Sequence, residues 1–170
     1  MEAYVLPRLV EALAGIQGRI ASLRVAPHDL VKRGQTIATL VPGPGDDDRR
    51  EVGVKAPVDG VVTSCWVARG DPVGRHSPIV SLSSADDVMI VALFAPESAR
   101  ALRRGDAATV ILGSKARETC QARVLSVIDA RDPGTFVSAS DARWTRVVLS
   151  LPQAPVAALW AGTAAEVVIG

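Results

Sequence analysis

Asp46, Asp47 and Asp48 form the densest group of potential metal ligands in the sequence. Carboxylate oxygens are the ligands that Ca²⁺ and Mg²⁺ prefer. Three adjacent residues on one loop seldom converge on a single ion, however, and the proline- and glycine-rich residues 42–45 disfavour a helix that would order them. We therefore interpret residues 46–50 as a solvated loop and predict no metal site there.

The two histidines, His28 and His76, lack the companions that a metal or catalytic site needs. His28 follows Pro27 in a turn, and neither histidine has a cysteine or carboxylate at ligand spacing. The spacing indicates no Ser/His/Asp or Cys/His set, and the motifs GxxxxGK[ST] and GxGxxG do not occur. We expect both histidines to be exposed on loops. We predict no catalytic, cofactor-binding or metal-ligating residue and no cofactor.

The two cysteines, Cys65 and Cys120, lie in different segments without CxxC spacing. They therefore indicate neither a disulfide framework nor a metal site. Cys120 shares a predicted strand face with Ala122 and Val124. We expect both thiols to serve as small buried hydrophobes. A bridge between them stays open for an oxidising compartment.

Three tryptophans, Trp66, Trp144 and Trp160, are the remaining candidates for a binding site. Indole rings can stack on sugars, but aromatic side chains dominate the energetics of cores. We expect these three in the core or at the rim of a barrel.

Composition excludes several classes of function. The 170 residues carry 19 basic and 18 acidic side chains, a net charge of +1, and no basic run that would bind phosphates. We therefore predict no nucleic-acid partner. The longest apolar run, residues 88–95, suits a strand and is far shorter than the roughly 18 residues of a membrane span. A strand-like stretch follows Met1 directly, without a signal peptide, so we expect the sequence to be part of a longer protein.

A duplicated stretch organises the predicted elements. Residues 18–40 (GRIASLRVAPHDLVKRGQTIATL) align without a gap to residues 60–82 (GVVTSCWVARGDPVGRHSPIVSL), 42 positions later. Cys65 aligns with Leu23, and His76 aligns with Gly34. Two copies are too few for a solenoid, so we expect two halves that close on each other. The nine identical pairs are Gly18/Gly60, Ser22/Ser64, Val25/Val67, Ala26/Ala68, Asp29/Asp71, Val31/Val73, Arg33/Arg75, Ile37/Ile79 and Leu40/Leu82.

Each copy reads as strand, turn, strand. Alternation over residues 20–25 is the period of a half-buried strand, and Pro27-His28-Asp29 breaks it with turn chemistry. Residues 41–54 connect the two copies. Outside the repeat, we expect an edge strand over residues 3–12, interrupted by Pro7.

The second half of the sequence predicts a small antiparallel barrel. Strands are expected over residues 88–95, 107–112, 118–128, 143–151 and 164–169, and turn chemistry occurs at residues 132–134. Pro96, Glu97 and Gly105 predict one short helix over residues 96–104.

The segments APVDGVV (residues 56–62), VARGDPV (67–73) and PIVSL (78–82) resemble the second half of a biotinyl/lipoyl domain. GRIASLRV and DLVKRGQTIATL resemble its first half. VMIVALFAPESARALRRGDAATVIL, ARVLSVIDARDPGTF and LWAGTAAEVVIG resemble the β-barrel of periplasmic adaptor proteins, the membrane fusion proteins of the haemolysin-secretion type. The opening AYVLPRLVEALAGIQGRI resembles the segment that follows the membrane anchor in the multidrug-export branch.

The resemblance implies an all-β fold with two domains. A lipoyl-like barrel-sandwich hybrid of two pseudo-symmetric halves is expected over residues 13–84. An adaptor-type antiparallel β-barrel with one short helix is expected from residues 1–12 and 85–170.

The connection between the lipoyl-like halves departs from the exporters of this family, which insert a long α-helical hairpin there. Only residues 41–54 occupy that place, and two helices of about 5 residues each would extend only about 8 Å. Either the hairpin is missing from this sequence or the protein belongs to hairpin-less relatives, such as the periplasmic part of the alginate co-polymerase. A role in interaction stays open for residues 46–50, because tips at this location face partners in the family.

A biotin or lipoate carrier domain is the alternative from another class. Carriers need a lysine at the tip, and the equivalent position here is Arg49, followed by Arg50 without a nearby methionine. A guanidinium cannot form the amide link. Lys55 lies too close to the APVDG segment, in the strand. The carrier alternative is therefore disfavoured.

The resemblance implies a non-catalytic adaptor subunit of an envelope-spanning export complex. We expect it in the periplasm, anchored to the inner membrane by an N-terminal segment that precedes this sequence. The expected partners are an inner-membrane transporter or polysaccharide synthase, periplasmic or outer-membrane export components, and further copies of the chain. An exopolysaccharide machine of the alginate type is preferred, and an adaptor of a tripartite drug or protein exporter without its hairpin is the alternative.

Overall fold

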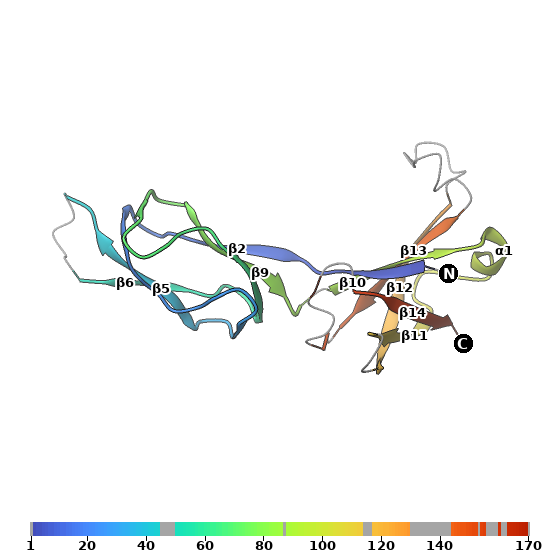
Figure 1. Cartoon of the computed structure of the whole chain (residues 1–170). Helices are drawn as coiled ribbons and strands as arrows, with labels where there is room; N and C mark the ends of the chain where they lie inside the picture. Colours follow the sequence, from blue (N-terminus) through green and yellow to red (C-terminus); the bar gives the residue numbers. More distant parts are fainter. Residues whose placement is uncertain are drawn as a thin grey trace. The chain divides into compact units, whose positions relative to one another are not determined.

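The computed structural model describes residues 2–44, 50–86, 88–113, 117–129, 144–152, 154, 155, 160 and 163–169. The chain forms two compact units. We call Leu9–Asp86 the sandwich unit, and Met1–Arg8 together with Asp87–Gly170 the barrel unit. The sequence places the corresponding boundaries at residues 13 and 84. Strands dominate both units, which confirms the predicted all-β class (Figure 1).

Two four-stranded antiparallel sheets build the sandwich unit. The first sheet has the strand order β2 (Leu9–Leu13), β9 (Pro78–Ser84), β7 (Gly60–Cys65) and β4 (Leu30–Val31). The second has the order β6 (Val52–Lys55), β5 (Thr36–Pro42), β3 (Gly18–Leu23) and β8 (Pro72–Val73).

A shift of 42 residues maps one sheet onto the other. It carries β3, β4 and β5 onto β7, β8 and β9, and it carries β2 onto β6 apart from one residue at the start. Each sheet therefore combines strands from both copies of the repeat. The two pseudo-symmetric halves predicted from the sequence are confirmed, and they are interleaved instead of lying side by side.

Backbone hydrogen bonds exchanged between the copies lock this interleaving. The His28 N–H donates to the Val62 carbonyl, and at the equivalent positions the Gly70 N–H donates to the Ile20 carbonyl, both at 2.8 Å. The Val62 N–H returns a bond to the carbonyl of Asp29 at 2.9 Å. The turn of each copy thus satisfies the strand of the other, and neither copy has a complete set of backbone partners alone.

The core of the sandwich unit lies between the two sheets and draws equally on both copies. Ile37 and Ile79, which are repeat-equivalent, are both fully buried, as are Leu40 and Leu82. Burying a side chain of this size contributes about 1.5–3 kcal/mol. Four of the nine identical pairs therefore belong to this core: Val25/Val67, Val31/Val73, Ile37/Ile79 and Leu40/Leu82.

The barrel unit is one six-stranded antiparallel sheet that curls until its ends meet. The Val5 N–H donates to the Thr163 carbonyl at 3.0 Å, and Tyr4 pairs with Ala164, which joins the first strand to the stretch before the last. The strand order is β1 (Glu2–Leu6), β10 (Val88–Phe94), β13 (Thr145–Leu151), β12 (Glu118–Asp129), β11 (Ala107–Leu112) and β14 (Ala165–Ile169).

The helix is shorter than the sequence predicts. It spans α1 (Pro96–Ala99) instead of residues 96–104. The backbone N–H of Arg103 donates to the carboxylate of Asp106, with 2.7 Å between the nitrogen and Oδ2, instead of extending the helix. A short acidic side chain that captures a nearby backbone N–H favours a turn over helix continuation.

The first stretch also differs from its prediction. The expected single strand over residues 3–12 is two strands, β1 and β2, which belong to different sheets and different units. Pro7 lies between them and has no N–H to donate to a ladder. The proline therefore separates two strands where the sequence predicted an interruption within one. The predicted turn at residues 132–134 lies outside the described residues.

At Gly18 and Gly60 the backbone of a neighbouring strand leaves no room for a side chain. An added Cβ would fall on the carbonyl oxygen of Val41 at Gly18, and on that of Ser83 at Gly60. We predict that Gly18→Ala and Gly60→Ala each lower the free energy of unfolding by roughly 1–3 kcal/mol, because backbone must move to relieve the overlap. Chemical denaturation measures this loss.

Gly15→Ala is the matched control, since a Cβ there meets nothing within 4 Å. If the variants at Gly18 and Gly60 unfold at the same denaturant concentration as this control, the close approach does not constrain the fold.

Candidate functional site

The histidines occupy turn positions that the repeat otherwise fills with glycine. His28 has φ 81° and its counterpart Gly70 has φ 93°, while His76 has φ 67° and its counterpart Gly34 has φ 83°. A non-glycine residue in this left-handed region is strained. Both histidines are exposed, and the described residues contain no cluster of three or more histidine, cysteine or acidic side chains that would hold a metal ion. Their placement indicates a role in turn geometry.

The two thiols are free and partly buried, one in each unit. Cys65 packs against the core of the sandwich unit, where its Sγ donates to the Val25 carbonyl at 3.8 Å. Burial raises the pKa of Cys65, and the negative charge of Asp29 adds to the rise. Burial followed by the charge of Glu118 raises the pKa of Cys120. Thiols held in the protonated form are poor nucleophiles, so neither has the character of a catalytic cysteine.

The tip between the two copies is described only at its flanks. Asp46, Asp47, Asp48 and Arg49 lie outside the described residues. Lys55 is exposed at the end of β6 and pairs with Thr36 of β5. It therefore lies in a strand, as the sequence predicted.

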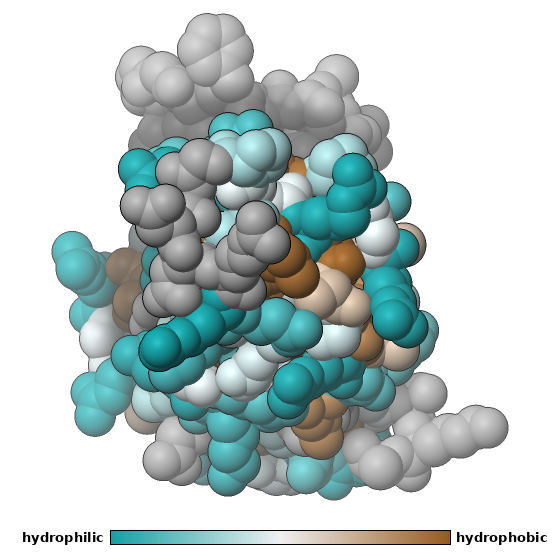
Figure 2. All heavy atoms as spheres, turned by 90° about the vertical axis from the view of Figure 1, so that its left-hand side faces the viewer, coloured by the Kyte–Doolittle hydropathy of each residue, from teal (hydrophilic) through white to brown (hydrophobic). Residues whose placement is uncertain are grey.

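A groove of about 480 Å³ lies beside these flanks. Arg19 contributes from β3, where its guanidinium Nη1 donates to the Gly70 carbonyl. Val41 and Pro42 contribute from β5, and Pro72 from β8. Figure 2 looks at the molecule from this side and shows hydrophobic side chains exposed among hydrophilic ones.

The equivalent region of the second copy is closed. Val41 is 40% exposed, whereas its counterpart Ser83 is fully buried. Arg19 is exposed, whereas its counterpart Val61 is buried. The surface around Val41 therefore differs from the surface at its pseudo-symmetric position among the described residues.

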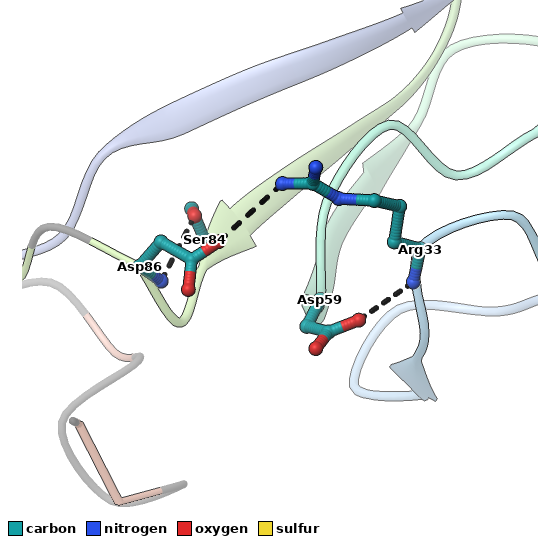
Figure 3. A network of polar contacts seen from close by, with 4 residues as sticks. All are labelled: Arg33, Asp59, Ser84 and Asp86. Atoms are coloured by element: carbon teal, nitrogen blue, oxygen red, sulfur yellow. Dashed lines mark hydrogen bonds and ion pairs between the residues drawn. The ribbon is translucent and has the colours of Figure 1, made fainter.

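A polar network joins Arg33 of the first copy to residues that flank the second copy (Figure 3). The Arg33 backbone N–H donates to Asp59 Oδ1 at 2.7 Å, and the Arg33 guanidinium lies 3.6 Å from Asp86 Oδ2. The Asp86 N–H donates to Ser84 Oγ at 3.1 Å. Both charged side chains of the ion pair are largely exposed, so the pair contributes about 0–1 kcal/mol. Its effect is to orient the loop that leaves β9.

The outer faces of the two sheets differ most. The strand register and the core contacts place four apolar side chains on the outer face of the first sheet, with exposures between 43% and 64%. The pseudo-symmetric positions on the second sheet hold Glu51, Lys55, Pro72 and Arg24. We call the first set the apolar face; it consists of Leu9, Leu13, Leu30 and Trp66.

Trp66 is the largest member of the apolar face. Its Nε1–H donates to Ser81 Oγ at 2.8 Å, so the indole lies against β9, and 58% of the residue remains exposed. The expectation that Trp66 belongs to the core or to a barrel rim is wrong. Trp144, in contrast, lies at the end of the barrel, immediately before β13. Trp160 is half-buried in the barrel unit.

Solved structures with a similar fold cover nearly the whole chain. The periplasmic adaptor protein EmrA matches with a TM-score of 0.68 and 12% identity, over 98% of this chain and 96% of the other. ZneB from Cupriavidus metallidurans matches with a TM-score of 0.61 and 16% identity, over 98% and 95%. The membrane fusion protein Spr0693 from Streptococcus pneumoniae R6 matches with a TM-score of 0.55 and 9% identity, over 100% and 97%.

The chain has the fold of the periplasmic adaptor proteins. The resemblance predicted from the sequence is thereby confirmed at the level of the fold. No family model matches the sequence, and no curated protein matches it either. Among the helices that the structure describes, none has the length and hydropathy needed to cross a bilayer.

The cysteine environments predict a pH dependence. Because the folded-state pKa of both thiols lies above that of the unfolded chain, their contribution to stability is complete below the unfolded pKa. It is lost as the pH rises through the folded pKa. We expect iodoacetamide to modify the folded protein more slowly than the urea-unfolded protein at the same pH, with the rate rising at higher pH. Mass spectrometry of the alkylated chain measures the modification rate in the folded and in the unfolded state. Equal rates in the two states would contradict the partial burial of the thiols.

Proposed function

We propose that the protein is a non-catalytic adaptor subunit that links an inner-membrane transporter to periplasmic or outer-membrane components of an export complex. Its fold, shared over nearly its whole length with adaptor and membrane fusion proteins, supports this proposal. The observation that carries it is the apolar face, because three of its four large exposed apolar side chains stand where the symmetry-equivalent positions hold charged residues. Exposed apolar side chains of this size that gather on one sheet face are typical of protein contact sites.

The exported cargo is the finer part of the proposal. Two of the structural neighbours reported above are named as an adaptor and a membrane fusion protein, and none of the three is named for polysaccharide export. We therefore favour an adaptor of a tripartite efflux or export system over the exopolysaccharide machine preferred from the sequence. The proposed location is the periplasm, with an anchor in the inner membrane supplied by residues that precede Met1.

Self-association through the apolar face is the third part of the proposal. An adaptor that surrounds a transport path needs several copies, and the apolar face offers an aromatic anchor for a second copy. Tryptophan, the residue type at position 66, is strongly enriched at the hot spots of protein interfaces. Its indole N–H is already satisfied by Ser81, so burying the ring against a second chain leaves no unpaired donor.

Trp66→Arg tests the apolar face, because it introduces the residue type found at the symmetry-equivalent Arg24. Loss of a tryptophan hot spot costs about 2 kcal/mol or more, so we expect self-association to weaken roughly 30-fold or more. Sedimentation velocity over a range of concentrations measures the change. Arg24→Ala on the other sheet is the matched control and should leave the distribution unchanged. Equal association of all three proteins would rule out the apolar face as the contact.

The function itself is tested in the native host by deleting the gene and measuring drug tolerance, polymer secretion and the membrane fraction of the tagged protein. We expect reduced tolerance, restored by the wild-type gene and not by the Trp66→Arg variant, and recovery of the protein with the inner membrane. Loss of polymer with normal tolerance would instead favour the exopolysaccharide machine. Normal phenotypes with a protein absent from the inner membrane would contradict the adaptor assignment.

A further inference from the structure

One end of the barrel unit gathers arginines that the proposed function does not use. β10 ends there, α1 follows, and β11, β13 and β1 begin there, as the pairings Phe94↔Thr145 and Glu2↔Leu93 require. The last strand ends there as well, since Ile169 pairs with Ala108. Figure 1 accordingly shows both ends of the chain near α1. We call this the α1 end of the barrel.

Four exposed arginines share the α1 end: Arg100, Arg103, Arg104 and Arg123. The first three fall within five residues of the connection between α1 and β11. Two hydrogen bonds bring the fourth alongside: the Gly105 N–H donates to the Val124 carbonyl at 2.8 Å, and the Val124 N–H donates to the Asp106 carbonyl at 2.9 Å. Arg123 directly precedes Val124, and its strand partner in β11 is Ala107, which is also exposed.

These charges are not neutralised locally. Among the described residues, no carboxylate forms an ion pair with Arg100, Arg104 or Arg123. Arg103 turns its guanidinium onto backbone, where Nη1 donates to the Arg100 carbonyl at 2.8 Å. The carboxylate of Asp106 is engaged by a backbone N–H.

The opposite end of the barrel provides an internal comparison. There, Arg117 is paired with Glu166, with 2.8 Å between the guanidinium Nη2 and Oε2. The α1 end also carries acidic side chains, since Glu97 lies on α1 and Asp129 pairs with Thr145, so its unpaired positive charge is local to Arg123 and to the connection between α1 and β11.

An exposed tryptophan accompanies the arginines. Trp144 is 40% exposed and immediately precedes β13, and α1 lies against β13. Tryptophan is enriched at the level of lipid headgroups, where its ring is apolar and its N–H meets water. Guanidinium groups bind phosphate through paired N–H donors. The α1 end thus carries an exposed indole and unpaired arginines, two features that an anionic phospholipid surface can engage.

We propose that the α1 end of the barrel binds the surface of a bilayer that contains anionic phospholipids, with Arg100, Arg104 and Arg123 on the phosphates and Trp144 at the headgroup level. The inference takes its cellular setting from the proposed function, since a periplasmic protein anchored to the inner membrane is held next to such a surface. Residue 2 lies at the α1 end, so an anchor that precedes Met1 would present this end to the bilayer.

The test is co-sedimentation of the 170-residue protein with vesicles of phosphatidylcholine alone, or of phosphatidylcholine with roughly 30 mol% phosphatidylglycerol, at roughly 0.05 M and 0.5 M salt. Each arginine near an anionic surface strengthens binding about fivefold. We expect binding to the anionic vesicles at low salt only. The triple variant Arg100→Gln, Arg104→Gln and Arg123→Gln should bind about 100-fold more weakly.

The matched control neutralises three exposed cations of the sandwich unit, through Arg24→Gln, Lys55→Gln and Arg69→Gln, and should bind like the wild type. Thermal unfolding of both triple variants checks that they fold. Trp144 is followed by fluorescence in a Trp66→Phe, Trp160→Phe background, where anionic vesicles should shift its emission to shorter wavelength.

Three outcomes would overturn the proposal: no binding to anionic vesicles, equal binding to neutral and anionic vesicles, or equal loss in the two triple variants. If the α1 end bound an acidic protein and did not bind the vesicles, the assignment of a lipid surface would likewise be wrong. The vesicle assay needs neither cargo nor self-association. A negative vesicle assay would therefore not affect the adaptor assignment, which the gene deletion tests separately.

Discussion

The sandwich unit depends on the exchange of backbone hydrogen bonds between the two copies of the repeat. The His28 and Gly70 amides each bond to the strand of the other copy, and the carbonyls of Asp29 and Asp71 receive bonds in return. Since a buried backbone group without a partner costs about 1–3 kcal/mol, neither copy can be removed without orphaning several groups in the other. A second constraint acts within each copy and keeps glycine at Gly18 and Gly60, where the first strand lies closely against its own closing strand.

The same reciprocity makes each copy a reference for the other. Positions that serve the fold are equivalent in both, as with Ile37 and Ile79 in the core. Positions that differ are free of that constraint, so their differences report on function. Trp66 stands where the other copy has Arg24, and the groove beside Val41 is open where Ser83 is buried. Both differences concern the surface of the sandwich unit and leave its core unchanged.

The sequence predicted the fold well because the repeat carries its pattern in identical residues. The prediction for Trp66 rested on residue type, because aromatic side chains dominate cores, and it was wrong. Simple alternation from the buried Val62 would turn residue 66 into the core, but the register of β7 against β9 shifts between Val62 and Ser64. This bulge reverses the alternation, so Cys65 faces the core and Trp66 faces outward. Nothing in the local sequence marks the bulge. The predicted helix was too long for a comparable reason, because the Asp106 side chain accepts a hydrogen bond from the backbone N–H of Arg103.

The α1 end of the barrel illustrates a second limit, which concerns charge. The net charge of +1 is a sum over the chain, and it gives no information on where unpaired charges lie. Arg123 is separated from Arg104 by 18 intervening residues, and only the antiparallel pairing of β11 with β12 brings them to one surface. Arg117 directly precedes β12, and its charge is compensated by Glu166 because β14 pairs with β11 on the other side. Register therefore decides which arginines are neutralised and which stay available, so a nearly neutral chain can still present several unpaired arginines on one surface.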